Sequence, residues 1–163
     1  MNRAALLVLT SVVLLASCSN DDLNGPFTFS GSCDVFDVTD ITLDTDPATV
    51  ARFEVLANCN MGSAIGEVGG VIDYVVTSNT SNNTLVISGQ SFYSTSETDI
   101  MVGEITGTGT QVNPTTFNFV GTESYVGGTG DFDDIFGTGQ ITGGTLTITA
   151  PGSGGWTVVG AID

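Results

Sequence analysis

The stretch YVGGTGDFDDIFGTGQITG, residues 125–143, is the most strongly patterned part of this 163-residue chain. Five glycines, Gly127, Gly128, Gly130, Gly137 and Gly139, lie close together in it, with Phe132 between them. Each glycine removes a side chain from packing and adds backbone freedom, so this composition predicts an ordered loop and not a packed strand. We expect the Phe132 side chain to pin the loop to the end of a sheet or barrel.

Segments with strand periodicity lie on both sides of this loop. In residues 116–125 one face carries Phe117, Phe119, Glu123 and Tyr125, while the other face carries threonine, asparagine and serine. Residues 140–150 alternate in the same way around Leu146 and Ile148. A period of two residues is typical of β-strands, so the loop joins two strands.

Similar alternation recurs along the chain and is separated by turn-forming residues. We expect eight strands near residues 27–35, 50–57, 69–77, 84–93, 99–108, 115–125, 139–149 and 156–162. No long window has helical spacing. The pattern predicts a single all-β domain over residues 27–163.

The segment GGTGDFDDIFGTG, Gly127 to Gly139, resembles the GGxGxFxxxxGxG signature shared by allene oxide cyclase and dirigent proteins, and by bacterial exported proteins with a similar barrel. The resemblance is tightest over these residues and looser from Asn60 to Asp163. It implies an eight-stranded antiparallel, calycin-like β-barrel that encloses an apolar cavity. None of the cyclase's catalytic positions matches this chain, so the resemblance implies a fold and not an activity.

The first seventeen residues have the pattern of an export signal. Arg3 precedes an apolar run, Ala4 to Leu15, that is too short to span a bilayer as a mature helix. The sequence Leu-Ala-Ser-Cys ending at Cys18 resembles the lipobox of bacterial lipoproteins, which implies acylation of Cys18; an ordinary cleaved signal is the alternative. Residues 18–26 then form an acidic, turn-rich tether. We expect an outer-membrane lipoprotein on the periplasmic face or cell surface.

The charge balance limits the partners. Cleavage before Cys18 leaves Arg52 as the only basic residue against eighteen acidic residues. Nucleic-acid affinity comes from lysine and arginine that neutralise phosphates, so a nucleic-acid partner is excluded. Anionic membrane surfaces would repel the domain too, so the lipid is its expected membrane anchor.

The chain contains no histidine, and its only basic residues are Arg3 and Arg52. A Ser-His-Asp triad, a histidine-bearing zinc site and a lysine Schiff base are therefore all excluded. Chemistry in this protein would depend on carboxylates, tyrosines and hydroxyl groups.

After lipidation of Cys18, Cys33 and Cys59 remain as a pair. An exported protein is folded in an oxidising compartment, which favours a disulfide between them over two free buried thiols.

Candidate ligand-binding residues are Phe117, Phe119, Glu123 and Tyr125, with Tyr74 as a weaker member. If this strand face points into a barrel, it would line an apolar pocket with a carboxylate and a phenol near one mouth. A desolvated Glu123 would have a raised pKa and could act as an acid or base. Tyr125 and Glu104 are the other weak catalytic candidates, and packing with Glu123 in solvent is the alternative.

The acidic residues Asp131, Asp133 and Asp134 raise the possibility of a loop calcium site. Calcium requires six to eight oxygen ligands, and the segment has only a superficial likeness to a calcium-binding nonapeptide repeat. Phe132 stands where that repeat needs aspartate, and only one copy is present. The sequence therefore predicts no metal or cofactor.

Three functions remain open. The leading hypothesis is a lipid-anchored envelope protein that binds a small hydrophobic ligand in a barrel cavity. The second is a cyclase or isomerase that steers a reactive apolar substrate. The third is a structural or adhesive surface protein whose barrel is filled by side chains.

Overall fold

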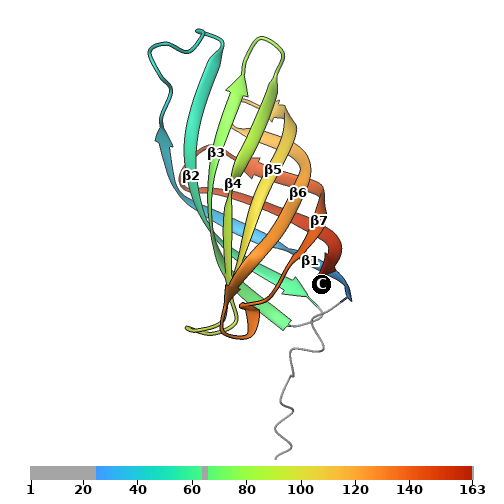
Figure 1. Ribbon diagram of the computed structural model, residues 1–163. Helices are drawn as coiled ribbons and strands as arrows, with labels where there is room; N and C mark the ends of the chain where they lie inside the picture. Colours follow the sequence, from blue (N-terminus) through green and yellow to red (C-terminus); the bar gives the residue numbers. More distant parts are fainter. Residues whose placement is uncertain (1–24, 64–65, 163) are drawn as a thin grey trace, which may run out of the picture.

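The computed structural model describes residues 25–63 and 66–162, which form a closed barrel of eight antiparallel strands (Figure 1). The strands are β1 (Gly25–Asp40), β2 (Val50–Ser63), β3 (Gly66–Asn79), β4 (Thr84–Ser94), β5 (Ile100–Asn113), β6 (Thr116–Thr129), β7 (Gly137–Thr147) and β8 (Gly152–Ile162). Each strand pairs with the next along the chain, and β8 pairs with β1. The predicted eight-stranded antiparallel barrel is confirmed.

Seven of the eight strands are longer than the sequence pattern predicts, and β7 has the expected length but begins two residues earlier. β6 continues to Thr129 and β7 begins at Gly137, so four of the five loop glycines lie within strands, which corrects the expected loop bounds. At Gly128 a side chain would overlap the carbonyl of Ile100 and lie 2.9 Å from Phe132 Cβ. Glycine is therefore required here for the close approach of neighbouring segments, and not for a loop.

The remaining connection, residues 130–136, covers one end of the barrel. It begins with a 3₁₀ turn, η2 (Gly130–Phe132), and buries the Phe132 and Ile135 side chains. Gly130 has a φ of +63°, which other residues rarely adopt. The Asp131 N–H donates to Asp99 Oδ1 at 3.2 Å, and this bond ties the turn to the β4–β5 connection.

Both described chain ends lie at this same end of the barrel, which is the lower end in Figure 1. Gly25 of β1 pairs with Ile162 of β8, and Ile162 pairs with Gly137 of β7. The predicted signal segment, the lipidation site Cys18 and most of the tether precede Gly25, outside the described residues. β1 itself begins at Gly25, two residues before the expected strand.

The barrel interior is packed with the inward-facing side chains of all eight strands. In β4, for example, Leu85, Ile87, Ser91 and Tyr93 are buried, while Val86 and Phe92 between them are exposed. The wall of the barrel is rich in threonine and glycine, so burial of these apolar side chains makes the main favourable contribution to the free energy of folding. Within the described residues there is no helix of the length and apolarity that crossing a membrane requires.

The expected disulfide is confirmed and joins β1 to β2. Cys33 and Cys59 are directly opposed in the antiparallel register, and both are buried. Because both side chains point into the barrel, the bond fixes the first hairpin from the inside.

We predict that Cys33→Ser together with Cys59→Ser lowers the free energy of unfolding by about 3 kcal/mol, because the unfolded chain regains the freedom of a loop of this length. Urea denaturation of the oxidised wild type, the reduced wild type and the double variant is the measurement. The two disulfide-free forms should agree with each other; equal stability of all three forms would contradict the prediction.

Candidate functional site

Glu123 is a carboxyl group buried inside the barrel. It lies on β6 between Phe119 and Tyr125 on the inward face, and its side chain is 0% exposed. The only basic residue in the described chain, Arg52, is bonded to Asp46 at 3.0 Å, so Glu123 has no counter-charge within the described residues. Burial without a nearby cation strongly disfavours the charged form of a carboxyl group, so Glu123 is an unusual residue for an apolar interior.

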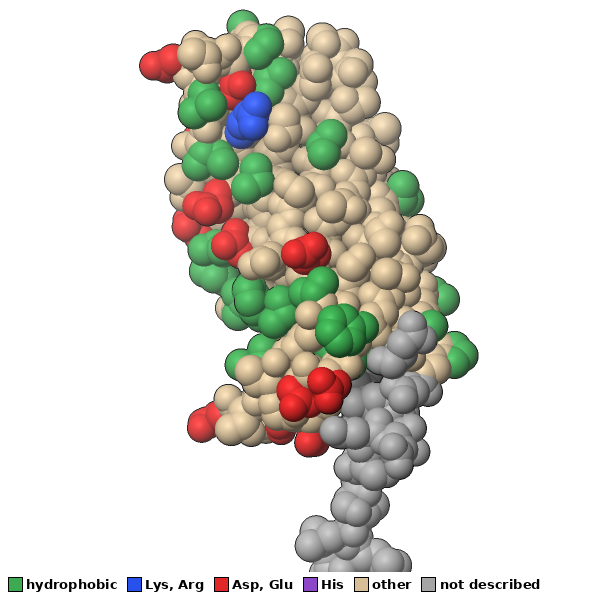
Figure 2. All heavy atoms as spheres, in the orientation of Figure 1, with side chains coloured by type: hydrophobic (Ala, Val, Ile, Leu, Met, Phe, Trp, Pro, Cys, Tyr) green, Lys and Arg blue, Asp and Glu red, His purple; other side chains and the backbone are tan. Residues whose placement is uncertain are grey.

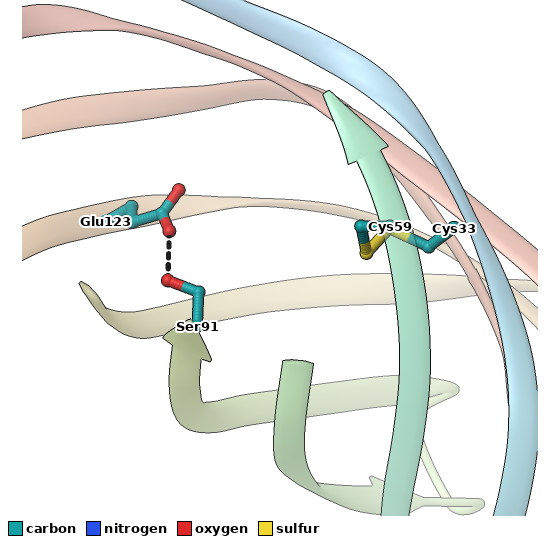
Figure 3. Close-up of a disulfide and its surroundings, with 4 residues drawn as sticks. All are labelled: Cys33, Cys59, Ser91 and Glu123. Carbon is teal, nitrogen blue, oxygen red and sulfur yellow. Dashed lines mark hydrogen bonds between the residues drawn. A yellow bond between two sulfur atoms is a disulfide. The ribbon is translucent and has the colours of Figure 1, made fainter. Parts of the chain in front are cut away.

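Ser91 of β4 is the hydrogen-bond partner of Glu123. Its hydroxyl donates to Glu123 Oε1, and the two side chains point toward one another across β5 (Figure 3). Gly103 of β5 lies between them: it pairs with Ser91 on one side and with Tyr125 on the other. A side chain at Gly103 would overlap the Ser91 hydroxyl and lie 2.9 Å from Glu123 Oε1, so glycine leaves the room that this bond occupies.

Three further polar groups surround the carboxyl. The hydroxyls of Tyr93 and Tyr125 and the indole nitrogen of Trp156 are buried, and none makes a hydrogen bond of normal geometry; Oε2 of Glu123 has no partner either. All three groups are nevertheless close enough to affect the pKa of Glu123. A buried polar group without any partner costs about 1–3 kcal/mol, so the incomplete hydrogen bonding in this cluster lowers the stability of the fold.

The electrostatics of the cluster favour protonated groups. Burial raises the pKa of Glu123, and the donors Ser91, Tyr93, Tyr125 and Trp156 offset this rise only in part. Burial also raises the pKa of Tyr93 and Tyr125, and the nearby Glu123 charge adds to the effect. The tyrosines therefore stay protonated, and the carboxyl holds its proton to a higher pH than an exposed glutamate would.

Aromatic rings of β1 form the apolar side of this cluster. Phe27 meets the ring of Tyr125 edge-on, with ring centroids 5.3 Å apart. Phe29 stacks on Tyr93 with centroids 6.2 Å apart and is tilted against Tyr125 at the same distance. The carboxyl thus lies beside an aromatic cluster that an apolar molecule could contact.

A small cavity lies next to Trp156. It measures about 10 Å³ and is lined by Tyr74, Ile87, Ile105, Phe119, Leu146 and Trp156. Such a volume has room for about one water molecule. The side chains therefore fill this part of the barrel, in contrast to the open apolar cavity that the family resemblance implies.

The structure brings together only some of the candidate residues that the sequence suggests. Glu123 and Tyr125 lie in one cluster, Tyr74 and Phe119 line the small cavity, and Phe117 is buried without lining that cavity. Glu104 is exposed on the outer face, so its assignment as a catalytic candidate inside the barrel is wrong. Side chains alternate between the two faces of a strand, so Glu104 points outward because its neighbour Ile105 points inward.

Sequence reasoning missed Ser91 as a member of this cluster. The alternation of β4 was the available signal, because Ser91 shares the parity of Leu85, Ile87 and Tyr93 and is therefore an inward-facing polar residue. Its partner could not be inferred, since that requires the register of β4, β5 and β6.

The acidic residues of the lower loop do not form a metal site. Asp131, Asp133 and Asp134 are all exposed. Among the residues that the structure describes, no three or more histidine, cysteine, aspartate or glutamate side chains are grouped so that they could hold a metal ion. The calcium hypothesis therefore has no geometric support.

No family model, curated protein or solved structure matches this chain. The function must therefore be argued from the barrel and its buried cluster.

We predict that Gly103→Ala destabilises the protein by about 2 kcal/mol, because the new methyl group would force Ser91 and Glu123 apart in a packed interior. The matched control is Gly69→Ala on β3, where a side chain would meet nothing within 4 Å. Urea denaturation followed by the emission of Trp156, the only tryptophan, measures both variants. Equal stability of the two variants would show that Gly103 is not needed for room.

The stability of the protein should also depend on pH through Glu123. Below pH about 4.5 the carboxyl is protonated in both the folded and the unfolded chain, and its contribution is fully present. As the pH rises, the unfolded chain loses this proton first, so the free energy of unfolding falls by at most about 1.4 kcal/mol per pH unit until the raised pKa is passed.

In Glu123→Gln this fall should be absent, so the variant gains stability relative to the wild type as the pH rises above about 4.5. Urea denaturation of both proteins at increasing pH is the measurement. Hydrogen bonds lower the pKa of Asp40, Asp46 and Asp99, but these groups act at lower pH and equally in both proteins. Parallel stability curves would refute a raised pKa at Glu123.

Proposed function

We propose that this protein is a lipid-anchored envelope protein that binds a small hydrophobic molecule inside the barrel, with the polar end of that molecule at Glu123. The single observation that carries the proposal is the buried carboxyl among donors that lack partners. Polar groups left unsatisfied in an apolar interior lower stability, and sites that bind or react are where such a cost is retained.

The chemistry of the cluster specifies the polar end of the ligand. Trp156 Nε1 is a donor only, and the tyrosine hydroxyls stay protonated because burial raises their pKa. Glu123 in its protonated form adds a further donor. A neutral acceptor such as a carbonyl or ether oxygen would satisfy several of these groups at once, whereas the acidic charge of the chain disfavours an anionic ligand.

Entry of a ligand requires side chains to move, because the cavity beside Trp156 is only about 10 Å³. The side chains at the lower end of the barrel can rearrange most easily to admit a ligand. Met101 pairs with both Tyr93 and Gly128, and Phe132 packs over Gly128 from the 130–136 connection. Methionine adapts its shape readily, and a short connection between glycines moves more easily than a strand.

The membrane anchor belongs to the same proposal. The lipobox-like sequence at Cys18 lies seven residues before Gly25, where β1 begins at the lower end. An acylated Cys18 would hold the lower end of the barrel close to a membrane, which is a source of hydrophobic molecules.

A cyclase or isomerase is the second candidate. The observation that favours it is a carboxyl in an apolar enclosure whose raised pKa lets it hold a proton at a pH where an exposed glutamate has lost it. Recovery of a co-purified molecule in a rearranged form, in wild type and not in Glu123→Gln, would favour this candidate over simple binding.

We predict that the purified protein binds the neutral hydrophobic dye Nile red, which carries a carbonyl acceptor, and that binding changes the emission of Trp156. Glu123→Leu should weaken the binding by about tenfold, because the dye loses one hydrogen bond from the protonated carboxyl group. Glu104→Leu is the matched control, because Glu104 is an exposed glutamate on the outer face, and it should bind the dye like the wild type.

Mass spectrometry of organic extracts of the same preparations adds an independent readout of small molecules that co-purify. Absence of both dye binding and co-purified molecules would overturn the proposal. The filled barrel would then favour the third hypothesis, a structural or adhesive surface protein.

A further inference from the structure

A row of apolar side chains crosses the outer surface of the barrel near its lower end. Its exposed members are Val71 of β3, Phe92 of β4, Val126 of β6 and Phe136 just before β7, and the half-buried Val102 of β5 completes it. We call this row the apolar stripe. Phe136 and Val126 are 56% and 44% exposed, and Val71 and Phe92 are 43% and 38% exposed.

Strand register makes the stripe continuous. Val71 pairs with Phe92, and Phe92 pairs with Val102. Val126 fills the irregularity beside Val102, and the pairing of Tyr125 with Gly137 places Phe136 next to Val126. Single exposed apolar residues are ordinary, but a contiguous row with two phenylalanines marks an interaction surface.

Acidic residues flank the stripe on both sides. The next outward row toward the upper end contains Asp73 and Glu104, which are exposed. On the other side lie the exposed acidic residues of the two lower connections, Glu97, Asp131, Asp133 and Asp134. Figure 2 shows hydrophobic side chains gathered on the lower half of this face, with acidic side chains above and below them.

We propose that the apolar stripe is a docking surface for a basic protein segment, one that presents apolar side chains flanked by lysine or arginine. Charge complementarity carries this choice of partner, because the apolar centre and its two acidic borders match such a segment. A second copy of this chain would place acidic borders against acidic borders, and its only basic side chain in the described residues is bonded to Asp46.

A lipid surface fits the stripe less well. The carboxylates on both sides would have to approach the headgroups together with the phenylalanines, which is unfavourable at anionic surfaces and costs desolvation at neutral ones. The proposal is independent of the barrel interior, so it stands or falls separately from ligand binding at Glu123.

Two synthetic peptides with blocked ends test the proposal. One alternates leucine with lysine, and the other alternates serine with lysine at the same length and charge. Isothermal titration should show that the wild type binds the leucine–lysine peptide about tenfold more tightly than the serine–lysine peptide, because only the former can fill the stripe.

The variant Phe92→Ser with Phe136→Ser should abolish this difference between the peptides. The matched control, Val86→Ser with Val120→Ser, removes two exposed valines of β4 and β6 outside the stripe and should preserve the difference. Circular dichroism checks that both variants retain the barrel. Equal binding of the leucine–lysine peptide by the wild type and the stripe variant would overturn the proposal.

Sedimentation and vesicle flotation separate the other occupants. A dimer of the wild type that the stripe variant loses would assign the stripe to a second copy and overturn the basic partner. Stripe-dependent flotation with phosphatidylcholine vesicles would assign it to lipid and overturn the proposal equally.

Discussion

The hydrogen bonds between β1 and β8 are the constraint on which the rest of the structure depends. They run from Gly25 opposite Ile162 to Val35 opposite Gly152 and convert an open sheet into a barrel. Closure satisfies the backbone of both terminal strands and leaves no exposed edge. It also creates a single enclosed interior, and without that enclosure the burial of Glu123 would not occur.

Within that interior the packing and the polar chemistry oppose each other. Phe119, Trp156 and their aliphatic neighbours pack closely around a cavity of only about 10 Å³. In the same interior, Glu123 Oε2, the hydroxyls of Tyr93 and Tyr125 and the indole nitrogen of Trp156 remain incompletely bonded. A barrel selected for stability alone would replace Glu123 with an apolar residue, so the retained carboxyl is the strongest argument for a role beyond structure.

Much of the fold could be predicted from the sequence, because strand periodicity and turn residues are local signals. The alternation around Phe117 and Phe119 predicts an inward face correctly, and the cysteine count predicts the disulfide. The glycines near Gly128 were harder: a glycine in a strand for close backbone approach and a glycine in a loop have the same composition, and only the register distinguishes them.

The candidate site was less predictable for the same reason. Glu123 is visible as a charged residue on an apolar face, but Ser91 and Trp156 reach it through strand pairings that no local pattern reveals. The apolar stripe was also invisible in the sequence, since its members come from four strands and one connection and meet only when the register is known. Conversely, Glu104 was a weak catalytic candidate, and its place between the buried Gly103 and Ile105 puts it on the outer face.

The pairing of the first strand with the last has a consequence for how the molecule is made. Because synthesis proceeds from the N-terminus, β1 must wait for its second neighbour until the final eleven-residue strand has been completed. Such long-range pairing makes folding slow, and until then two strand edges stay open to misassembly. The hairpin that Cys33 and Cys59 join needs no later segment, so it can become oxidised first and hold the growing sheet in register while the remainder of the polypeptide arrives.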